Sequence, residues 1–494
     1  MRNYVYALLL GSIFPLGFAP FDLYPITLIS ISLFIFLLDK KNNSNHYLLG
    51  FFYGLGLWSV GISWVYVSIH YHGDISIIMS LLITFLFAAF LSLYFSALTF
   101  LYSFFKTNDT HVNYIVLFPI LWVSIEIVRS HLFTGFPWLI VGSSLSGTSL
   151  GGWTPILGSY GSSLIILMSA GCLTSIMNQR KRLEFYSTLL FLLFLISSFS
   201  LNKYNWTSED EELNTFLYQP NLSLRDKWSI NGFNKTKKLI EQAVAISKKG
   251  DLIVFPETAI IFDKTEIAPW IKEINFKLIQ KEASLISGII AKDSTNEYLI
   301  ERYNRFQGFG ILNSHYDKVH LVPFGEYVPL RDYLGGVMDV LGINMISTLP
   351  GESINSLKAG NIRVSPSICY EIAFNNLIRK TAKTSNLIIT ISNDTWFGRS
   401  FGPEQHLEIA QTRALEHQKI LLRATNSGVS AIIGRKGEVL KRQGIFEQKE
   451  LKGKIYLYEG NTPFSIVGNS IIYIIILLTY MYLFYIKRTN VHKY

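Results

Sequence analysis

Long apolar runs are the feature of this sequence that most restricts its fold. A helix that crosses the hydrocarbon core of a bilayer needs about 20 mostly apolar residues. Charged residues make up 16% of the chain, well below the roughly 25% of an average globular protein. The sequence therefore predicts a polytopic α-helical membrane protein with eight spans, near residues 4–21, 23–38, 47–69, 75–105, 112–130, 156–178, 183–201 and 464–486.

Basic residues beside these runs predict how the spans are oriented, because Lys and Arg near span ends favour the cytoplasmic side. Arg2 precedes the first run, and Lys40 and Lys106 follow the second and fourth. The first run resembles a signal peptide but lacks a small-x-small cleavage site, so we interpret it as a retained span. This orientation places the segments 131–155 and 202–463 outside the cytoplasm.

The segment 202–463 has a different character from the apolar runs. Short apolar or β-branched stretches alternate with helical patterns, which is typical of an α/β domain whose functional groups follow strand ends. We expect strands at 213–218, 252–255, 285–290, 308–312, 362–368, 387–391 and 429–433, and helices at 231–248 and 403–418. The chain then divides into a seven-span membrane domain (1–201), an extracytoplasmic domain (202–463) and a last span with a cytoplasmic tail (464–494).

Three polar groups follow or lie beside the predicted strands. Glu257 comes after 252–255, Cys369 comes after 362–368, and Lys318 lies between them in the chain. A thiol, with a reference pKa of about 8.5, needs a base to take its proton and a cation to favour the anion. Glu257 can serve as the base, and Lys318 as a cation that also stabilises an oxyanion. Taken alone, Cys369 can equally be a small buried hydrophobic side chain.

Several other classes of function find no support. Cys172 lies in an apolar run, so a disulfide framework is not available. The net charge of +9 arises without the basic stripe that nucleic-acid-binding proteins use. His315, His320, His406 and His417 lack metal-ligand spacing, and no phosphate-binding glycine loop is present. We therefore predict no metal, no cofactor and no nucleic-acid partner.

The sequence around the three polar groups resembles the Glu-Lys-Cys triad of the carbon-nitrogen hydrolase (nitrilase) superfamily. The matching segments are Phe-Pro-Glu-Thr-Ala at 255–259, the run from Lys318 through Pro-Phe-Gly-Glu-Tyr-Val-Pro at 323–329, and Cys-Tyr-Glu at 369–371. Further segments resemble the apolipoprotein N-acyltransferase family across essentially the whole chain. They are Gly-Phe-Ala-Pro-Phe-Asp at 17–22, Phe-Pro-Trp at 136–138, Ser-Asn-Asp-Thr-Trp-Phe-Gly at 392–398 and Arg-Ala-Thr-Asn-Ser-Gly at 423–428.

This resemblance implies a nitrilase-like αββα sandwich on the periplasmic side of a bacterial inner membrane. An acyl chain is expected to pass from a phospholipid to Cys369 as a thioester. It then passes to the α-amino group of the N-terminal diacylglyceryl-cysteine of an apolipoprotein, in a ping-pong reaction. The resemblance implies no cofactor, and we expect a monomer.

The resemblance also carries roles to individual positions. Cys369 corresponds to the nucleophile, Glu257 to the general base and Lys318 to the stabiliser of the oxyanion and thiolate. The supporting positions are Glu326, Tyr370 and Glu371, and the substrate-associated position is Trp228, which can also be a packing residue. Ser143 departs from the expected tyrosine, so no lipid contact is assigned within 131–155.

Two alternatives remain open from the residues. A membrane-tethered amidase or nitrilase would use the same triad with water as the acceptor and a small amide as the substrate. A transporter or receptor would need polar groups lining its spans, and these are scarce. Glu126 and Arg129, three residues apart in one run, are interpreted as a structural pair.

Overall fold

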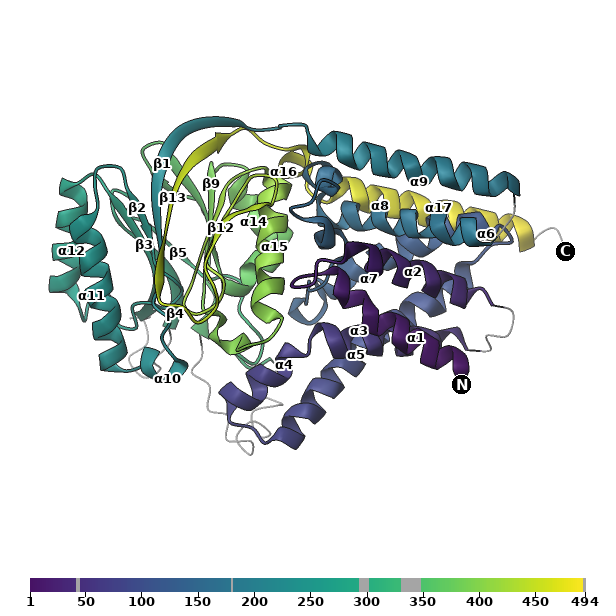
Figure 1. Ribbon diagram of the computed structural model, residues 1–494, viewed down its shortest axis with the longest axis horizontal. Coiled ribbons are helices and arrows are strands. Elements are labelled where there is room, and N and C mark those ends of the chain that lie inside the picture. The colour runs from purple at the N-terminus through teal and green to yellow at the C-terminus, as the bar shows by residue number, and fades with distance from the viewer. Residues whose placement is uncertain (41–44, 179–180, 293–301, 330–347, 492–494) are drawn as a thin grey trace. The chain divides into compact units, whose positions relative to one another are not determined.

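The computed structural model describes residues 1–40, 45–178, 181–292, 302–329 and 348–491, and these form two compact units. One unit contains Met1–Asn205, Trp396–Glu416 and Thr462–Tyr494, and the other contains Trp206–Thr395 and His417–Asn461. The first unit is helical and the second contains the sheets (Figure 1). The segment Trp396–Glu416 groups with the helical unit, although it lies inside the predicted extracytoplasmic domain in sequence.

In the helical unit, four described helices are long and apolar enough to cross a membrane: Ile77–Phe105, Thr110–Arg129, Gly151–Met177 and Glu184–Asn202. The bent pair His46–Gly61 and Trp64–His72 makes a fifth candidate. Two further apolar helices are shorter, Tyr24–Leu38 and Ser470–Tyr485. The principal helices are α1 (Arg2–Ile13), α2 (Tyr24–Leu38), α3 (His46–Gly61), α4 (Trp64–Val67), α5 (Ile77–Phe105), α7 (Phe118–Arg129), α8 (Thr154–Met177), α9 (Lys181–Asn202), α16 (Pro463–Val467) and α17 (Ser470–Val491).

The first predicted span is short because its sequence ends the helix early. Helix α1 ends at Ile13, and a 3₁₀ turn with Pro15 follows at Phe14–Gly17. Proline removes a backbone donor and fixes φ, which makes it a common helix breaker. The four to five candidate spans are therefore fewer than the eight apolar runs of the sequence.

Helix α15 (Gly402–His417) is a polar helix whose side chains bind irregular backbone within the helical unit. Gln405 Nε2 donates to the carbonyl oxygen of Gly61 at 3.2 Å, where α3 ends. The backbone N–H of Ser159 donates to Glu416 Oε1 at 2.9 Å, next to the kink inside α8. Because a buried backbone group without a partner costs free energy, α15 stabilises these helix breaks.

The segment 131–155 is irregular, and its Trp138 is buried, with 1% of the side chain exposed. Glu126 and Arg129 are both buried and both bind this segment. Arg129 Nη1 donates to the carbonyl oxygen of Trp138 at 2.7 Å, and the N–H of Val141 donates to Glu126 Oε1 at 2.9 Å. The two charged side chains therefore have a structural role in fixing the loop backbone.

The second unit contains two mixed sheets. The first has the strand order β13-β1-β2-β3-β4-β5, with β6 paired to β4, and the second has the order β12-β11-β10-β9-β8-β7. The strands of the first sheet are β1 (Ser208–Gln219), β2 (Leu252–Val254), β3 (Ser284–Lys292), β4 (Arg302–Gly310), β5 (His315–Asp317), β6 (Thr348–Leu349) and β13 (Lys449–Glu459). Those of the second sheet are β7 (Leu357–Ala359), β8 (Ile362–Ile368), β9 (Leu387–Ser392), β10 (Leu421–Thr425), β11 (Ala431–Ile433) and β12 (Val439–Arg442).

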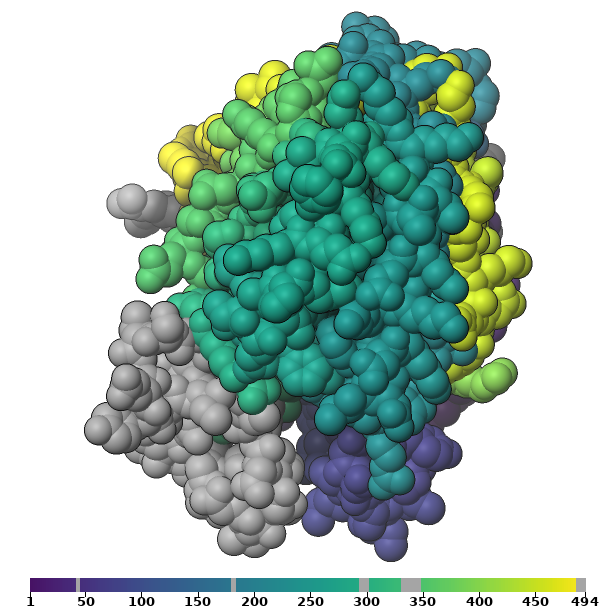
Figure 2. All heavy atoms as spheres, turned by 90° about the vertical axis from the view of Figure 1, so that its left-hand side faces the viewer, coloured from purple at the N-terminus to yellow at the C-terminus, as the bar shows by residue number. Residues whose placement is uncertain are grey.

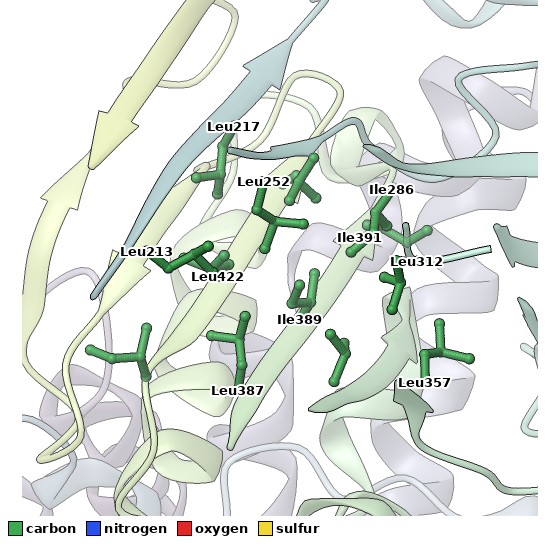
Figure 3. Packing of buried hydrophobic residues seen from close by; sticks show 14 of the residues in the cluster. Leu213, Leu217, Leu252, Ile286, Leu312, Leu357, Leu387, Ile389, Ile391 and Leu422 are labelled. Atoms are coloured by element: carbon green, nitrogen blue, oxygen red, sulfur yellow. The ribbon is translucent and has the colours of Figure 1, made fainter. Parts of the chain in front are cut away.

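The main core of this unit lies between the two sheets. Leu252 and Ile286 of the first sheet and Ile389 and Leu422 of the second belong to one buried cluster (Figure 3). Successive residues of a strand point to opposite faces, so Leu252 and Ile253 enter different cores. Ile253 packs with the helices on the outer face. A strand that is buried on both faces explains why the sequence of β2 is apolar throughout.

Helices cover the outer face of the first sheet. They are α11 (Ile230–Ile246) and α12 (Ala268–Gln280), whose apolar sides share a second buried cluster with β2 and β3. Figure 2 shows the side chains of this part of the chain as a closed layer. Helix α14 (Asn375–Ala382) packs against β8 of the other sheet.

Most elements predicted for the segment 202–463 are confirmed. The expected strands at 213–218, 252–255, 285–290, 362–368, 387–391 and 429–433 correspond to β1, β2, β3, β8, β9 and β11, and the expected helices to α11 and α15. The strand predicted at 308–312 has the wrong bounds, because β4 spans Arg302–Gly310 and Gly310 turns the chain with φ +77°. The first half of β4 is polar, so a search for apolar runs does not detect it as a strand.

Candidate active site

Cys369 begins the 3₁₀ turn Cys369–Ala373 directly after β8. Its φ of 53° lies in the left-handed region, which is uncommon for a residue with a side chain and occurs at functional turns. Burial above all, together with Glu257 and Asp394, raises the pKa of the thiol to about 12, although Lys318 and a hydrogen bond with Ser392 oppose this shift. The resting thiol is therefore protonated at neutral pH and needs a base before it can act as a nucleophile.

Lys318 follows β5 and is 1% exposed. Its Nζ lies 2.8 Å from Glu326 Oε1 and 3.6 Å from Glu257 Oε1. Burial alone would lower the pKa of this ammonium, but the two carboxylates outweigh burial and raise it. Lys318 therefore stays positively charged and interacts electrostatically with Cys369.

Glu257 follows β2 and is held at both carboxylate oxygens. Oε1 accepts a hydrogen bond from Asn304 Nδ2 at 2.7 Å, and Oε2 accepts one from the N–H of Asn393 at 2.8 Å. Gly288 of β3 lies against this turn, where an added Cβ would come within 2.6 Å of the Glu257 Cα. Only glycine permits so close an approach of backbone to the candidate base.

Glu371 and Glu326 fix the segment that carries Lys318. Glu371 is fully buried, and its Oε1 accepts hydrogen bonds from the Tyr316 hydroxyl at 2.7 Å and from the N–H of Val319 at 2.8 Å. Its Oε2 accepts from the N–H of Ile368 at 2.8 Å. Burial raises the pKa of Glu371 although these donors oppose the shift. The carboxylate thus ties the end of β8 to the end of β5.

The remaining two predicted positions are both aromatic. Tyr370 is half-buried and packs edge-on against Phe374, with ring centroids 5.1 Å apart. Trp228 follows the short helix α10 (Leu224–Lys227) and is 52% exposed. The structure therefore brings Glu257, Lys318, Cys369, Glu326 and Glu371 together, whereas Trp228 is exposed to solvent.

Asn304 is a site residue that the sequence patterns missed. Its Nδ2 lies 2.7 Å from Glu257 Oε1 and 3.1 Å from Glu326 Oε1, so one amide bridges both carboxylates. It comes from the polar half of β4, where no apolar period marks the strand. No signal in the single sequence identifies it.

We predict that Asn304→Ala lowers the rate of acyl transfer about tenfold to a hundredfold, because a misplaced general base loses most of its effect. The Michaelis constant should change little, since Asn304 is 6% exposed and its amide binds Glu257 and Glu326. Steady-state kinetics checks this prediction, with Asn275→Ala as the control. Asn275 Oδ1 accepts a hydrogen bond from the N–H of Gly310, at the far end of the same strand. Equal losses in both variants would contradict the assignment.

Asp394 and Arg423 form a fully buried ion pair, with Arg423 Nη2 2.5 Å from Asp394 Oδ2. Both residues belong to segments that the family resemblance had singled out without giving either a role. Asp394 acts on the site by raising the pKa of Cys369.

We expect Arg423→Met to destabilise the protein by about 3–5 kcal/mol, because it leaves a buried carboxylate without its counter-charge. Thermal unfolding in detergent measures the effect. Lys237→Met is the matched control, since its pair with Glu241 is 4.0 Å long and exposed to solvent. Such a surface pair contributes less than about 1 kcal/mol, so the two melting temperatures should separate clearly.

No group of three or more His, Cys, Asp or Glu that could hold a metal ion occurs within the described ranges. The chemistry available to the site is that of a thiol, carboxylates and an ammonium. These groups suit nucleophilic acyl transfer.

Comparisons with known proteins agree with both halves of the chain. Residues 10–172 match the apolipoprotein N-acyltransferase N-terminal domain, and residues 217–456 match the carbon-nitrogen hydrolase family. The apolipoprotein N-acyltransferase of Wigglesworthia glossinidia brevipalpis is 34% identical, over 97% of this chain and 97% of that protein. The chain belongs to the apolipoprotein N-acyltransferase family.

A second relative of the same name, from Nitrosomonas europaea, is 35% identical over 93% of this chain and 92% of that protein. Among solved structures, Saccharomyces cerevisiae Nit3, of branch 10 of the nitrilase superfamily, aligns with 17% identity and a TM-score of 0.38. That alignment covers 51% of this chain and 92% of that one. By its family the protein is an acyltransferase, with a carbon-nitrogen hydrolase domain and a helical region that contains apolar helices long enough to cross a membrane.

Proposed function

We propose that this apolipoprotein N-acyltransferase family member moves a fatty acyl chain from a phospholipid to the N-terminal amine of a diacylglyceryl apolipoprotein. The observation that carries the mechanism is the grouping of Cys369, Glu257 and Lys318 at three strand ends. In this proposal Cys369 is the nucleophile, Glu257 the general base and Lys318 the stabiliser of negative charge.

In the first half-reaction, Glu257 takes the proton of the Cys369 thiol as Sγ attacks the ester carbonyl carbon of the phospholipid. Lys318 stabilises the oxyanion that forms. Collapse breaks the bond between the carbonyl carbon and the glycerol oxygen, which takes the proton from Glu257. A lysophospholipid leaves, and the acyl chain stays on Cys369 as a thioester.

In the second half-reaction, the neutral α-amino group of the apolipoprotein attacks the thioester carbonyl. Glu257 accepts the amine proton, the carbon–sulfur bond breaks, and the departing Sγ recovers that proton. The product is an amide, and the enzyme returns to its starting state. Glu326, Tyr370 and Glu371 support the site, and Trp228 contacts substrate at its exposed face.

We further propose eight spans, with the carbon-nitrogen hydrolase domain on the periplasmic side of the bacterial inner membrane, and a monomeric enzyme without a cofactor. The four to five candidate spans and the two shorter apolar helices support a multi-pass arrangement. Lys40 and Lys106, which follow the second and fourth apolar runs, support this orientation. Both substrates are lipid-anchored, so an enzyme held in the bilayer meets them by lateral diffusion.

The test is mass spectrometry of the purified protein after incubation with a phospholipid of defined acyl chains. We expect the acyl mass on the peptide that contains Cys369, and its loss when a diacylglyceryl-cysteine peptide is added. The peptide containing Cys172, a buried cysteine, should stay unmodified and serves as the internal control. Absence of the adduct together with rapid hydrolysis of a small amide would instead identify an amidase.

A further inference from the structure

A second lysine, Lys227, lies buried beside the candidate site, and the mechanism above gives it no role. It ends helix α10 and is 3% exposed. Its Nζ donates a hydrogen bond to the carbonyl oxygen of Glu257 at 2.8 Å. A buried ammonium is costly unless negative charge compensates it, so its position next to the candidate base requires an explanation.

The cations near Glu257 can be matched with the carboxylates that they neutralise. Lys318 is shared between two carboxylates, with the shorter distance to Glu326 (2.8 Å) and the longer to Glu257 (3.6 Å). Lys318 neutralises only one of the two carboxylates, so one negative charge has no counter-charge from Lys318. Lys227 interacts electrostatically with Glu257 and, more weakly, with Cys369.

Burial lowers the pKa of Lys227 to about 8, and the interactions with Glu257 and then Cys369 oppose this shift. The ammonium is therefore charged below about pH 8, which includes the acidic range where a carboxylate takes up its proton. The charged groups that act on Cys369 from the other elements are Glu257, Lys318 and Asp394.

We propose that Lys227 is a positioning residue that serves as the second counter-charge of Glu257 and keeps this carboxylate ionised as the base for Cys369. The inference rests on the proposed roles of Glu257 and Cys369. The hydrogen bond described above joins Lys227 to the backbone of Glu257 and not to the Cys369 thiol. Lys227 acts through the backbone and the charge of Glu257.

Another buried lysine of the same unit provides a matched control. Lys419 is 1% exposed, and its Nζ donates to the carbonyl oxygens of Ala382 and Ser385 at the end of α14. Burial lowers its pKa to about 8 as well. The charges that act on it are Glu459 and Arg363, so Lys419 differs from Lys227 in lying away from Cys369.

The experiment measures the rate at which iodoacetamide alkylates Cys369 between pH 5 and pH 9, followed on the Cys369 peptide by mass spectrometry. This readout needs no lipid, so it can fail or succeed independently of acyl transfer. For Lys227→Met we expect the acid limb of the rate profile to move to higher pH by about one unit, which is roughly a tenfold slower reaction on that limb. Lys227→Arg should keep the normal limb, because it keeps the charge.

Lys227→Gln separates charge from hydrogen bonding, since it keeps an N–H donor for the carbonyl oxygen but carries no charge. We expect Lys227→Gln to shift the acid limb of the rate profile by the same amount as Lys227→Met. It also replaces Lys227→Met in the experiment if that variant is too unstable to purify. Lys419→Met should leave the limb in place. A uniform loss of rate at all pH values in Lys227→Gln, or an unshifted limb, would overturn the proposal.

Discussion

Cys369→Ser is expected to abolish formation of the acyl-enzyme and, with it, all acyl transfer. The substitution exchanges a polarisable thiol for a hydroxyl that Glu257 cannot deprotonate to a useful extent, while side-chain volume barely changes. The loss should reach the detection limit, at least about 10⁴-fold, since no other group in the site can carry the acyl chain. Mass spectrometry for the adduct and a turnover assay with a diacylglyceryl-cysteine peptide measure it.

The control for this variant is Cys172→Ser, which changes the other cysteine of the chain. Cys172 is buried in α8 of the helical unit, so its substitution should leave the adduct on Cys369 intact. Both proteins should melt as cooperatively as the wild type. Residual transfer by Cys369→Ser above a few per cent would rule out a covalent intermediate on this residue.

Lys318→Met is expected to reduce acyl transfer about 10³-fold, the loss typical of removing a preorganised group from an oxyanion site. The change also leaves Glu257 and Glu326 bridged by Asn304 without the cation between them. The two carboxylates then repel each other without that counter-charge, which disturbs the position of the candidate base. We therefore expect kcat to fall far more than KM rises.

Stability separates this effect from unfolding. Removing a buried partner of an ion pair costs about 3–5 kcal/mol. Lys419→Met, which removes an equally buried lysine elsewhere in the unit, should be destabilised but active. A folded Lys318→Met with near-normal kcat would remove Lys318 from the mechanism.

The positions of Glu257 and Cys369 were predictable because each ends a strand that is buried on both faces. Such strands are continuous apolar runs, and a polar group that interrupts one marks the sheet edge. Lys318 follows a strand of only three residues and was identified through the surrounding family motif instead. Its permanent charge then follows from the carboxylates on either side of it.

Asn304 and Lys227 could not be predicted from spacing. Asn304 lies in β4, whose first residues are polar and give no apolar pattern. Its role depends on two carboxylates, Glu257 and Glu326, that are distant in sequence. Lys227 precedes Trp228 in a segment that the resemblance had selected, yet only the fold brings its Nζ to the Glu257 carbonyl oxygen. Such contacts arise from topology, which local sequence does not encode.

Helix α15 also limits how this chain can be divided. The polypeptide passes between its two units four times, after residues 205, 395, 416 and 461. A fragment trimmed at both ends to 206–461 would still carry α15, whose buried Gln405 and Glu416 would lose their backbone partners in the helical unit. A soluble form of the hydrolase domain would therefore require deleting residues 396–416 and joining Thr395 to His417, so that this segment is treated as an insertion in the hydrolase domain.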